Sequence, residues 1–276
     1  MSFLAKSFHH ISAAPNQGEG LSLTIASDIG EDQLFFRLRG GIYNHHFFRF
    51  KGFSHCWWAF TQMQFARGAL RRVKGVTFTK LMGSGSQGGF SWLPNFRVYC
   101  LLICWEKEID YQQVYANSNK WFQRYTQRSS ENFSMQLRAY QQHGAWGGRD
   151  PFVNQEAEPP GHNQVAVITR AYIRASKLRS FWKLVPRISY RLGGMSGLKF
   201  TKGVGEWPLI ELTTISIWQN EEKMRAFAYG TPGHSRAVKQ TRQKNFFSEE
   251  LFARFIILDL SGTWQGNPVS LEGAIG

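Results

Sequence analysis

The sequence predicts an α+β fold made of two ferredoxin-like modules that arose by duplication within one chain. Phe-Thr-Lys followed by Gly-x-Gly occurs in residues 76–85 and again in residues 198–205. Each copy precedes an apolar strand that ends on a tryptophan, Trp105 or Trp218. Around these marks each half orders its elements as strand, helix, strand, strand, helix, strand, which is the ferredoxin-like order. Two such four-stranded sheets, packed face to face, predict a pseudo-symmetric barrel.

Shifts in composition set the expected boundaries of the modules. The first module is predicted at 41–150 and the second at 164–266, with a proline-rich linker, 151–163, between them. Residues 1–40 show little periodicity and predict a partly disordered N-terminal extension, and residues 267–276 predict a tail.

The first predicted helix of each half differs in how its apolar residues are distributed around the helix axis. In 176–191 apolar residues recur at spacings of three and four, which predicts an amphipathic helix with one face on the sheet. The first-half counterpart, Ser54 to Arg72, is apolar on too many sides for a simple surface helix. It is expected either to pack deeply or to present an apolar patch.

A strong excess of positive charge limits the partners of the chain. There are 33 Lys and Arg against 19 Asp and Glu in 276 residues, a formal net charge of +14. Such a surface attracts anionic partners: nucleic acid, acidic lipid headgroups or an acidic redox protein. The basic residues are scattered, and no RNP, zinc-finger or helix-turn-helix pattern occurs. A nucleic-acid partner is therefore not expected.

Cysteine usage and hydropathy indicate the compartment. The three cysteines form no CxxC pair, which argues against a disulfide framework and a zinc cage. Cys100 and Cys104 lie on one face of a predicted strand, where two buried thiols are expected. The longest apolar run, Tyr99 to Trp105, is far too short to span a bilayer, and no secretory signal is seen. We expect a cytoplasmic protein with peripheral contact at the inner face of an anionic membrane.

The two Gly-x-Gly motifs invite a phosphate-loop interpretation that their context does not support. Neither completes GxGxxG before a helix, since a strand follows in each half. Hairpin turns are the simpler interpretation. Lys80 and Lys202 precede these turns once per half, so an architectural role is expected for both.

His234 is the strongest candidate for a metal ligand. Thr231 and Pro232 predict a helix start, with His234 in the first turn and facing the sheet. The positive end of the helix dipole disfavours the imidazolium, and a neutral ring is the form that binds a metal or haem iron. Counted from the strand-end tryptophans, the repeat puts Trp121 at the equivalent first-half position. From position alone, a hydrogen-bonded core histidine stays an open alternative.

Arg254 is a charged residue in an otherwise apolar strand. Its neighbours on the same strand face are apolar. A guanidinium in that setting needs an anionic partner. The candidates are Glu249, Glu250 and an anionic ligand such as a haem propionate.

Several segments carry a family resemblance. They are KLMGSGSQGGF at 80–90, PNFRVYCLLICW at 94–105, FWKLVPRIS at 181–189, FTKGVGEWPLIELTTISIW at 200–218, and the segment 224–255 with MRAFAY, PGHSRAVKQTR and EELFARF. Together they resemble the spheroidene monooxygenases, a family of ketolases in bacterial carotenoid biosynthesis, over roughly Tyr43 to Gly266. Where the family often has Gly-Trp-Phe before the EEL segment, this chain has Asn245-Phe246-Phe247.

The resemblance implies a haem-dependent monooxygenase with a dimeric α/β-barrel type of fold. The implied cofactor is haem b, the oxidant is O2, the electron donor is a reduced ferredoxin, and the reaction hydroxylates and ketolates an acyclic carotenoid at C-2. It implies His234 as the axial ligand of the haem iron, and it makes a haem propionate a candidate partner for Arg254. An apolar substrate pocket is expected, and its candidate lining residues are aromatic or soft: Trp58, Phe60, Met63, Phe65, Trp121 and Phe227.

Two other functions stay open on the sequence. One is a different haem or cofactor-free oxidoreductase on the same fold, acting on another apolar substrate, because members of one fold differ in chemistry. The other is a basic, non-catalytic binding module. No Ser-His-Asp order, HExxH motif or isolated pair of carboxylates supports hydrolase chemistry.

Overall fold

The computed structural model describes most of the chain, in segments. These are residues 41–89, 91–107, 120–152, 163–183, 185, 195–207, 209–230 and 245–271. The predicted N-terminal extension, most of the predicted linker and His234 lie outside these segments.

Each half carries the predicted order of elements. The first half contains β1 (Tyr43–Arg49), α2 (Phe53–Arg71), β2 (Val76–Gly85), the short η1 (Gln87–Gly89), β3 (Pro94–Trp105), α4 (Lys120–Arg128) and β4 (Glu131–Gly144). The second half contains β5 (Val165–Ile173), η2 (Ala175–Lys177) with helix from 178 to 183, β6 (Leu198–Gly205), β7 (Glu211–Trp218), α6 (Glu221–Gly230) and β8 (Phe247–Trp264). A short β9 (Asn267–Pro268) follows β8.

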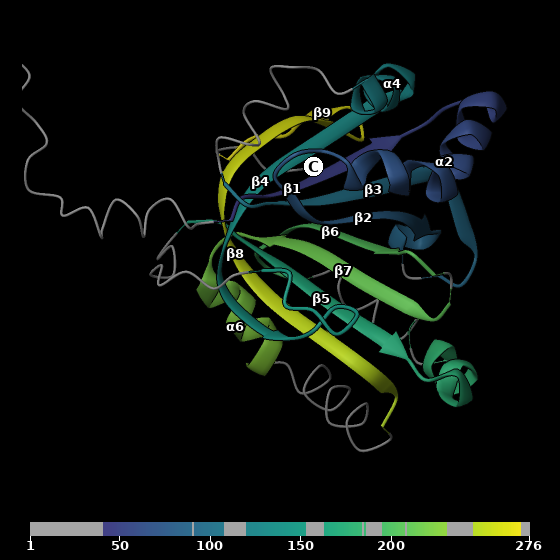
Figure 1. Ribbon diagram of the computed structural model, residues 1–276. Helices are drawn as coiled ribbons and strands as arrows, with labels where there is room; N and C mark the ends of the chain where they lie inside the picture. The colour runs from purple at the N-terminus through teal and green to yellow at the C-terminus, as the bar shows by residue number, and fades with distance from the viewer. Residues whose placement is uncertain are drawn as a thin grey trace, which may run out of the picture.

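The strands form one antiparallel sheet that closes on itself (Figure 1). Within the halves the orders are β4-β1-β3-β2 and β8-β5-β7-β6, so the two halves repeat the same topology. The two halves are joined at both edges, through β2–β6 and β4–β8, so their strands belong to one sheet. These joints pair the edge strands, which would otherwise expose unpaired backbone groups.

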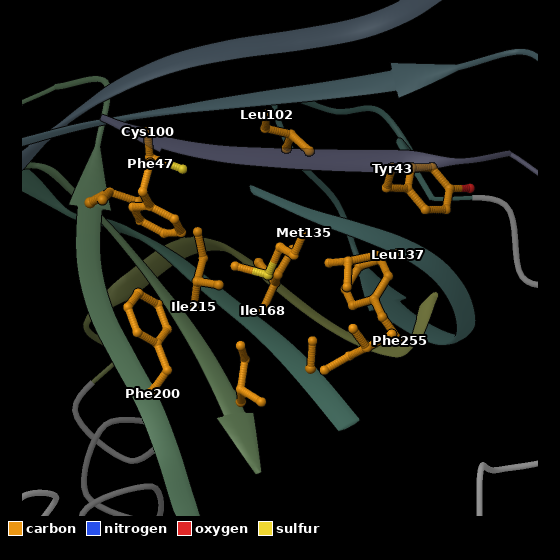
Figure 2. Close-up of a cluster of buried hydrophobic side chains, with 14 of the residues drawn as sticks. Tyr43, Phe47, Cys100, Leu102, Met135, Leu137, Ile168, Phe200, Ile215 and Phe255 are labelled. Atoms are coloured by element: carbon orange, nitrogen blue, oxygen red, sulfur yellow. The ribbon is translucent and has the colours of Figure 1, made fainter. Parts of the chain in front are cut away.

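Apolar side chains fill the space that the sheet encloses (Figure 2). Because side chains alternate along a strand, every second residue of each strand points into this space. Both halves contribute, for example with Tyr43, Phe47, Ile168, Phe200 and Phe255. Cys100 and Cys104 belong to this cluster, which confirms the two buried thiols, and burial raises the pKa of both. The enclosed space is thus packed core, so the outer faces of the sheet and its seams are where a bulky ligand can bind.

Helices cover the outer faces. In the first half, α2 and α4 pack on the sheet through a second cluster that includes Ala59, Leu70 and Tyr125. In the second half, the helix at 178–183 and α6 bring Phe181 and Met224 to two smaller clusters. No helix in the described segments has both the length and the apolar character needed to cross a bilayer.

The Gly-x-Gly motifs form the shorter seam between the halves. Gly83 and Ser84 at the end of β2 pair with Gly205 and Val204 of β6. The Ser84 hydroxyl donates to the carbonyl oxygen of Gly203 at 2.9 Å. The motifs are therefore strand ends that join the two modules, and the predicted hairpin turns are wrong.

Gly203→Ala is expected to lower the free energy of unfolding. A Cβ at Gly203 would lie 2.5 Å from the carbonyl oxygen of Gly89, which itself has a φ of 98°. Overpacking of this kind costs about 1–3 kcal/mol. Urea denaturation measures the change, and Gly68→Ala is the control, because a Cβ on that exposed face of α2 meets nothing within 4 Å. Equal unfolding midpoints for the two variants would contradict the close approach of Gly89 to Gly203.

Adjacent histidines of β1 point to opposite sides of the sheet. His46 packs on Phe122 of α4 at the outer face, while His45 pairs with Leu102 and Met135, whose side chains point inward. His45 is fully buried, and neither ring nitrogen has a hydrogen-bond partner among the described residues. Burial, with a smaller contribution from His46, lowers the pKa of His45 to about 3.

His45→Ile is expected to stabilise the protein more at pH 5 than at pH 7.5. A histidine with a lowered pKa in the folded state takes up its proton on unfolding, so stability is lost as pH falls below its ordinary pKa of 6.5. Ile168 occupies the equivalent position of the second half, so isoleucine fits the fold. Urea unfolding at both pH values tests this, and an equal gain at each would show that His45 does not titrate in this way.

Candidate functional site

The outer face of the second-half sheet is lined by small side chains. One row across four strands consists of Gly203, Thr214, Thr169 and Phe252, and the next consists of Thr201, Ser216, Val167 and Arg254. Gly203 is covered by the backbone of Gly89, so we use the name cradle for the other four small residues in these rows: Thr169, Thr201, Thr214 and Ser216.

The equivalent face of the first half is filled instead. Strand pairing matches the cradle with His46, Thr79, Leu101 and Ile103. All except Thr79 are larger than their second-half counterparts. Leu81, Leu101 and Ile103 pack against α2 and α4 in the apolar cluster of that face. The repeat is thus symmetric in its backbone, while His46, Leu101 and Ile103 of the first half correspond to smaller residues in the second half.

One buried polar atom of the cradle has no hydrogen-bond partner among the described residues. Thr201 Oγ1 is buried and has no hydrogen-bond partner within the described segments, whereas its counterpart Thr79 donates to the carbonyl oxygen of Leu102 at 3.0 Å. Thr169 is exposed. Small hydroxyl side chains beside such an unsatisfied oxygen offer hydrogen-bonding groups to a ligand on this face.

Arg254 ends the second row of this face. It is 3% exposed, and its Nη1 donates to Glu221 Oε1 of α6 at 3.1 Å. Arg225 shares the same carboxylate at 2.8 Å. Glu221 is therefore an anionic partner of Arg254, and it was not among the candidates named from the sequence. A buried cation next to the cradle can also bind a carboxylate of a ligand.

His234 lies outside the described residues, four positions after α6 ends at Gly230. Its counterpart by the repeat, Trp121, is described. Trp121 sits on α4, stacks on Tyr125 at 4.4 Å and donates to Gln62 Oε1 at 3.2 Å, over the outer face of the first half. Trp121 therefore faces the sheet in the first half. That His234 faces the sheet in the second half stays a prediction.

A cleft of about 110 Å³ opens at the β2–β6 seam. Its walls come from α2, the segment before β3, the helix at 178–183 and the β6–β7 connection, and its floor contains several glycines. Leu212 lines the cleft and lies two residues from Thr214 on the same face of β7. The cleft thus reaches the edge of the cradle. Ligand pockets for drug-sized molecules span roughly 300–1,000 Å³, so the cleft is too small to enclose a whole molecule of that size.

The six predicted pocket residues fall in different places. Phe60 and Met63 of α2 line the cleft. Trp58 and Trp121 pack on Tyr125 between α2 and α4. Phe65 is 75% exposed and does not line the cleft. Phe227 of α6 stacks on Trp218 at 5.1 Å beside the outer face of the second half.

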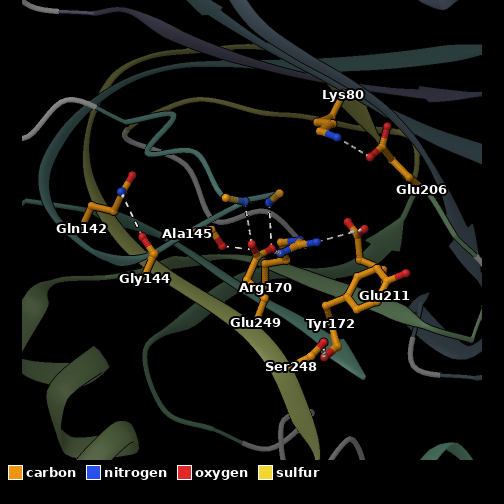
Figure 3. A network of polar contacts seen from close by, with 12 residues as sticks. Lys80, Gln142, Gly144, Ala145, Arg170, Tyr172, Glu206, Glu211, Ser248 and Glu249 are labelled. Atoms are coloured by element: carbon orange, nitrogen blue, oxygen red, sulfur yellow. Dashed lines mark hydrogen bonds and ion pairs between the residues drawn. The ribbon is translucent and has the colours of Figure 1, made fainter. Parts of the chain in front are cut away.

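A partly buried polar network (Figure 3) includes two acids that line the cleft, Glu206 and Glu211. Arg170 of β5 forms an ion pair with Glu249 and a second one with Glu211. In the second pair Arg170 Nη2 lies 3.4 Å from Glu211 Oε2, and Glu211 also lines the cleft. Lys80 Nζ lies 2.5 Å from Glu206 across the seam, in keeping with the architectural role expected for Lys80. Both acids of the cleft thus have a basic partner, and Arg170 serves Glu211 and Glu249 together. This network could not be predicted from the sequence, because its members are far apart in the chain.

Comparisons with known structures define the fold class. No protein-family model matches the chain. The fold is similar to that of an aldoxime dehydratase, with a TM-score of 0.52 and 14% identity over 80% of this chain and 82% of that one. An aldoxime dehydratase in complex with butyraldoxime gives a TM-score of 0.54 with 12% identity, covering 80% of each chain. At these identities the likeness concerns the fold alone.

Sequence relatives are more specific. Spheroidene monooxygenase of Rhodobacter capsulatus is 39% identical over 220 residues, covering 79% of this chain and 91% of the relative. The enzyme of the same name from Cereibacter sphaeroides is 34% identical over 221 residues, covering 79% of this chain and 67% of the relative. This chain belongs to the spheroidene monooxygenase family.

Proposed function

We propose that the chain is a haem-dependent monooxygenase that acts on an acyclic carotenoid at C-2, in carotenoid biosynthesis. The observation that carries the proposal is the 39% identity to a spheroidene monooxygenase over most of both chains. The cradle adds support from the structure, because one outer face of a duplicated sheet has exchanged bulky residues for small ones.

The residues present fit a haem on the outer face of the second half. Thr169, Thr201 and Thr214 carry small side chains that are not fully buried, which supports placing a flat macrocycle against the sheet here, and Arg254 would offer a guanidinium to a propionate carboxylate. His234 is the proposed axial ligand. Haem b, when bound, would supply the activation of O2.

The other described residues would position the substrate and keep water away. Phe60 and Met63 offer an apolar wall at the cleft, and the stacked Trp218 and Phe227 cover part of the outer face. In each turnover one oxygen atom of O2 enters the C–H bond at C-2, and the other leaves as water with two electrons and two protons. A second turnover at the same carbon gives a gem-diol, which loses water to form the ketone. A reduced ferredoxin is the proposed source of the electrons, attracted by the positive charge of the chain.

A haem spectrum of the purified chain tests the ligand assignment. Protein made in cells supplied with haem is expected to show a Soret band that shifts with dithionite and with CO. His234→Ala should lose or strongly shift the band, because the proposed iron ligand is removed. His143→Ala is the control, since His143 is exposed on β4. An unchanged band in His234→Ala would show that another residue binds the iron.

A different outcome would favour the other oxidoreductase. If the chain binds haem through His234 but leaves every acyclic carotenoid unaltered, the proposed substrate is wrong and another apolar substrate must be sought. If no haem binds and carotenoid is still oxidised, the proposed cofactor is wrong and the activity survives as a proposal.

A further inference from the structure

Helix α2 presents aromatic side chains to solvent as well as to the core. Ala59, Ala66 and Leu70 are buried against the sheet, while Phe53 and Trp57 are 84% and 58% exposed. The predicted alternatives, deep packing or an apolar patch, therefore both apply to this helix. Charged or polar residues normally occupy such an outward face, so the exposed aromatic residues need a physical reason.

The exposed aromatic residues gather around the cleft. Phe53 stacks on Trp57, Trp57 contacts Phe60 at 5.9 Å, and Phe60 contacts Phe96 at 5.4 Å. Further exposed aromatic residues come from the segment before β3 and from the β6–β7 connection, and these also line the cleft. We use the name aromatic rim for the whole set: Phe53, Trp57, Phe60, Trp92, Phe96 and Trp207.

The exposed charged residues that flank the aromatic rim in sequence are basic. From residue 41 to residue 105 the sequence contains no Asp or Glu, and none occurs between residues 163 and 205. Lys51 and Arg97 are exposed next to the rim residues Phe53 and Phe96, and Lys183 is exposed next to Trp182 of the cleft wall. Glu206 and Glu211 of the cleft pair with Lys80 and Arg170, and Arg170 also pairs with Glu249.

We propose that the aromatic rim docks the protein on an anionic lipid bilayer, with the cleft facing the membrane. Aromatic rings favour the interface of a bilayer, and basic residues beside them are attracted to acidic headgroups. A second copy of the chain would bring a like-charged surface against this one, which disfavours self-association through the rim. This inference rests on the proposed function only for the reason why the cleft faces the membrane. An apolar polyene dissolved in the bilayer would then enter the cleft directly, one end first.

Vesicle sedimentation with the full chain tests the docking surface. The protein is expected to bind vesicles of equal parts phosphatidylcholine and phosphatidylglycerol, and to bind less to phosphatidylcholine alone or at high salt. The double variant Phe53→Ser with Trp57→Ser should bind the mixed vesicles about tenfold more weakly or worse, because each ring loses its burial in the interface.

Phe65→Ser is the matched control. Phe65 is 75% exposed on the same helix and is five residues beyond Phe60, so it is turned away by about 140°. Binding of this variant should equal that of the unsubstituted chain. Equal binding by the double variant, equal loss in Phe65→Ser, or no binding by the unsubstituted chain would each overturn the proposal. The proposal would also be overturned if the unsubstituted chain formed a dimer in the absence of vesicles and the double variant did not. The aromatic rim would then be an interface between two copies of the chain.

The binding measurement separates this inference from the proposed function. Sedimentation requires neither haem nor turnover, so it can fail while the monooxygenase proposal stands. Conversely, the double variant should still convert carotenoid dispersed in detergent, since Phe53 and Trp57 do not line the cleft. Loss of that conversion in a folded double variant would contradict a role limited to docking.

Discussion

Filling the cradle is expected to weaken haem binding by one to two orders of magnitude while the chain stays folded. The variant Thr169→Leu with Thr214→Leu gives β5 and β7 bulky outer residues such as Leu101 of the first half. Overpacking costs about 1–3 kcal/mol, and about 1.4 kcal/mol corresponds to a tenfold change in Kd. Titration of the haem-free protein with haem, followed at the Soret band, measures the Kd.

A substitution on the other half serves as the control for the cradle. Ser134→Leu enlarges the residue beside His46 in the equivalent row of the first half. It should leave the Kd for haem unchanged. If the double variant binds haem as tightly as the unsubstituted chain, and circular dichroism shows it folded, the haem does not lie on this face.

Arg170→Met is expected to lower the free energy of unfolding by about 3–5 kcal/mol, the range for breaking a buried ion pair by removing one partner. Arg170 is 3% exposed, and its guanidinium lies 5.2 Å from the ring centre of Trp146. Burial raises the pKa of Glu211, and Arg170 opposes that rise. Without Arg170 the Glu211 carboxylate would be buried without its cation. Urea denaturation measures the loss.

Two further variants separate the ion pair from the arginine side chain alone. Arg174→Met removes an exposed arginine that donates to the carbonyl oxygen of Phe247, and it should cost much less. Arg170→Met combined with Glu211→Leu should recover part of the lost stability, because no buried charge is then unpaired at that position. A double variant less stable than Arg170→Met would show that Glu211 is stabilised by other contacts.

The repeat made much of the fold predictable from the sequence. Apolar strands ending at Trp105 and Trp218 define equivalent positions, and the structure pairs both halves in the same register around them. The helix boundaries agree closely where they are described, with α2 at Phe53–Arg71 against the predicted 54–72. Closure of the sheet by the β2–β6 seam was not predicted, because glycine motifs at strand ends were interpreted as turns.

The candidate site was less predictable, since its features arise from residues far apart in sequence. Glu221 was missed as the partner of Arg254 because 33 positions separate them. The aromatic rim needed the fold to bring α2 and the β6–β7 connection to one cleft. The cradle had a sequence signal that was not used: aligning the halves residue by residue sets Leu101 and Ile103 against Thr214 and Ser216.

Incubation of the haem-loaded chain with spheroidene, a reduced ferredoxin and isotopically labelled O2 tests the proposed function most directly. We expect the first product to be an alcohol at C-2 that carries one labelled oxygen atom, followed by the ketone at the same carbon. An unaltered carotenoid in the presence of bound haem and reduced ferredoxin, or a product whose oxygen comes from water, would contradict monooxygenation of an acyclic carotenoid by this chain.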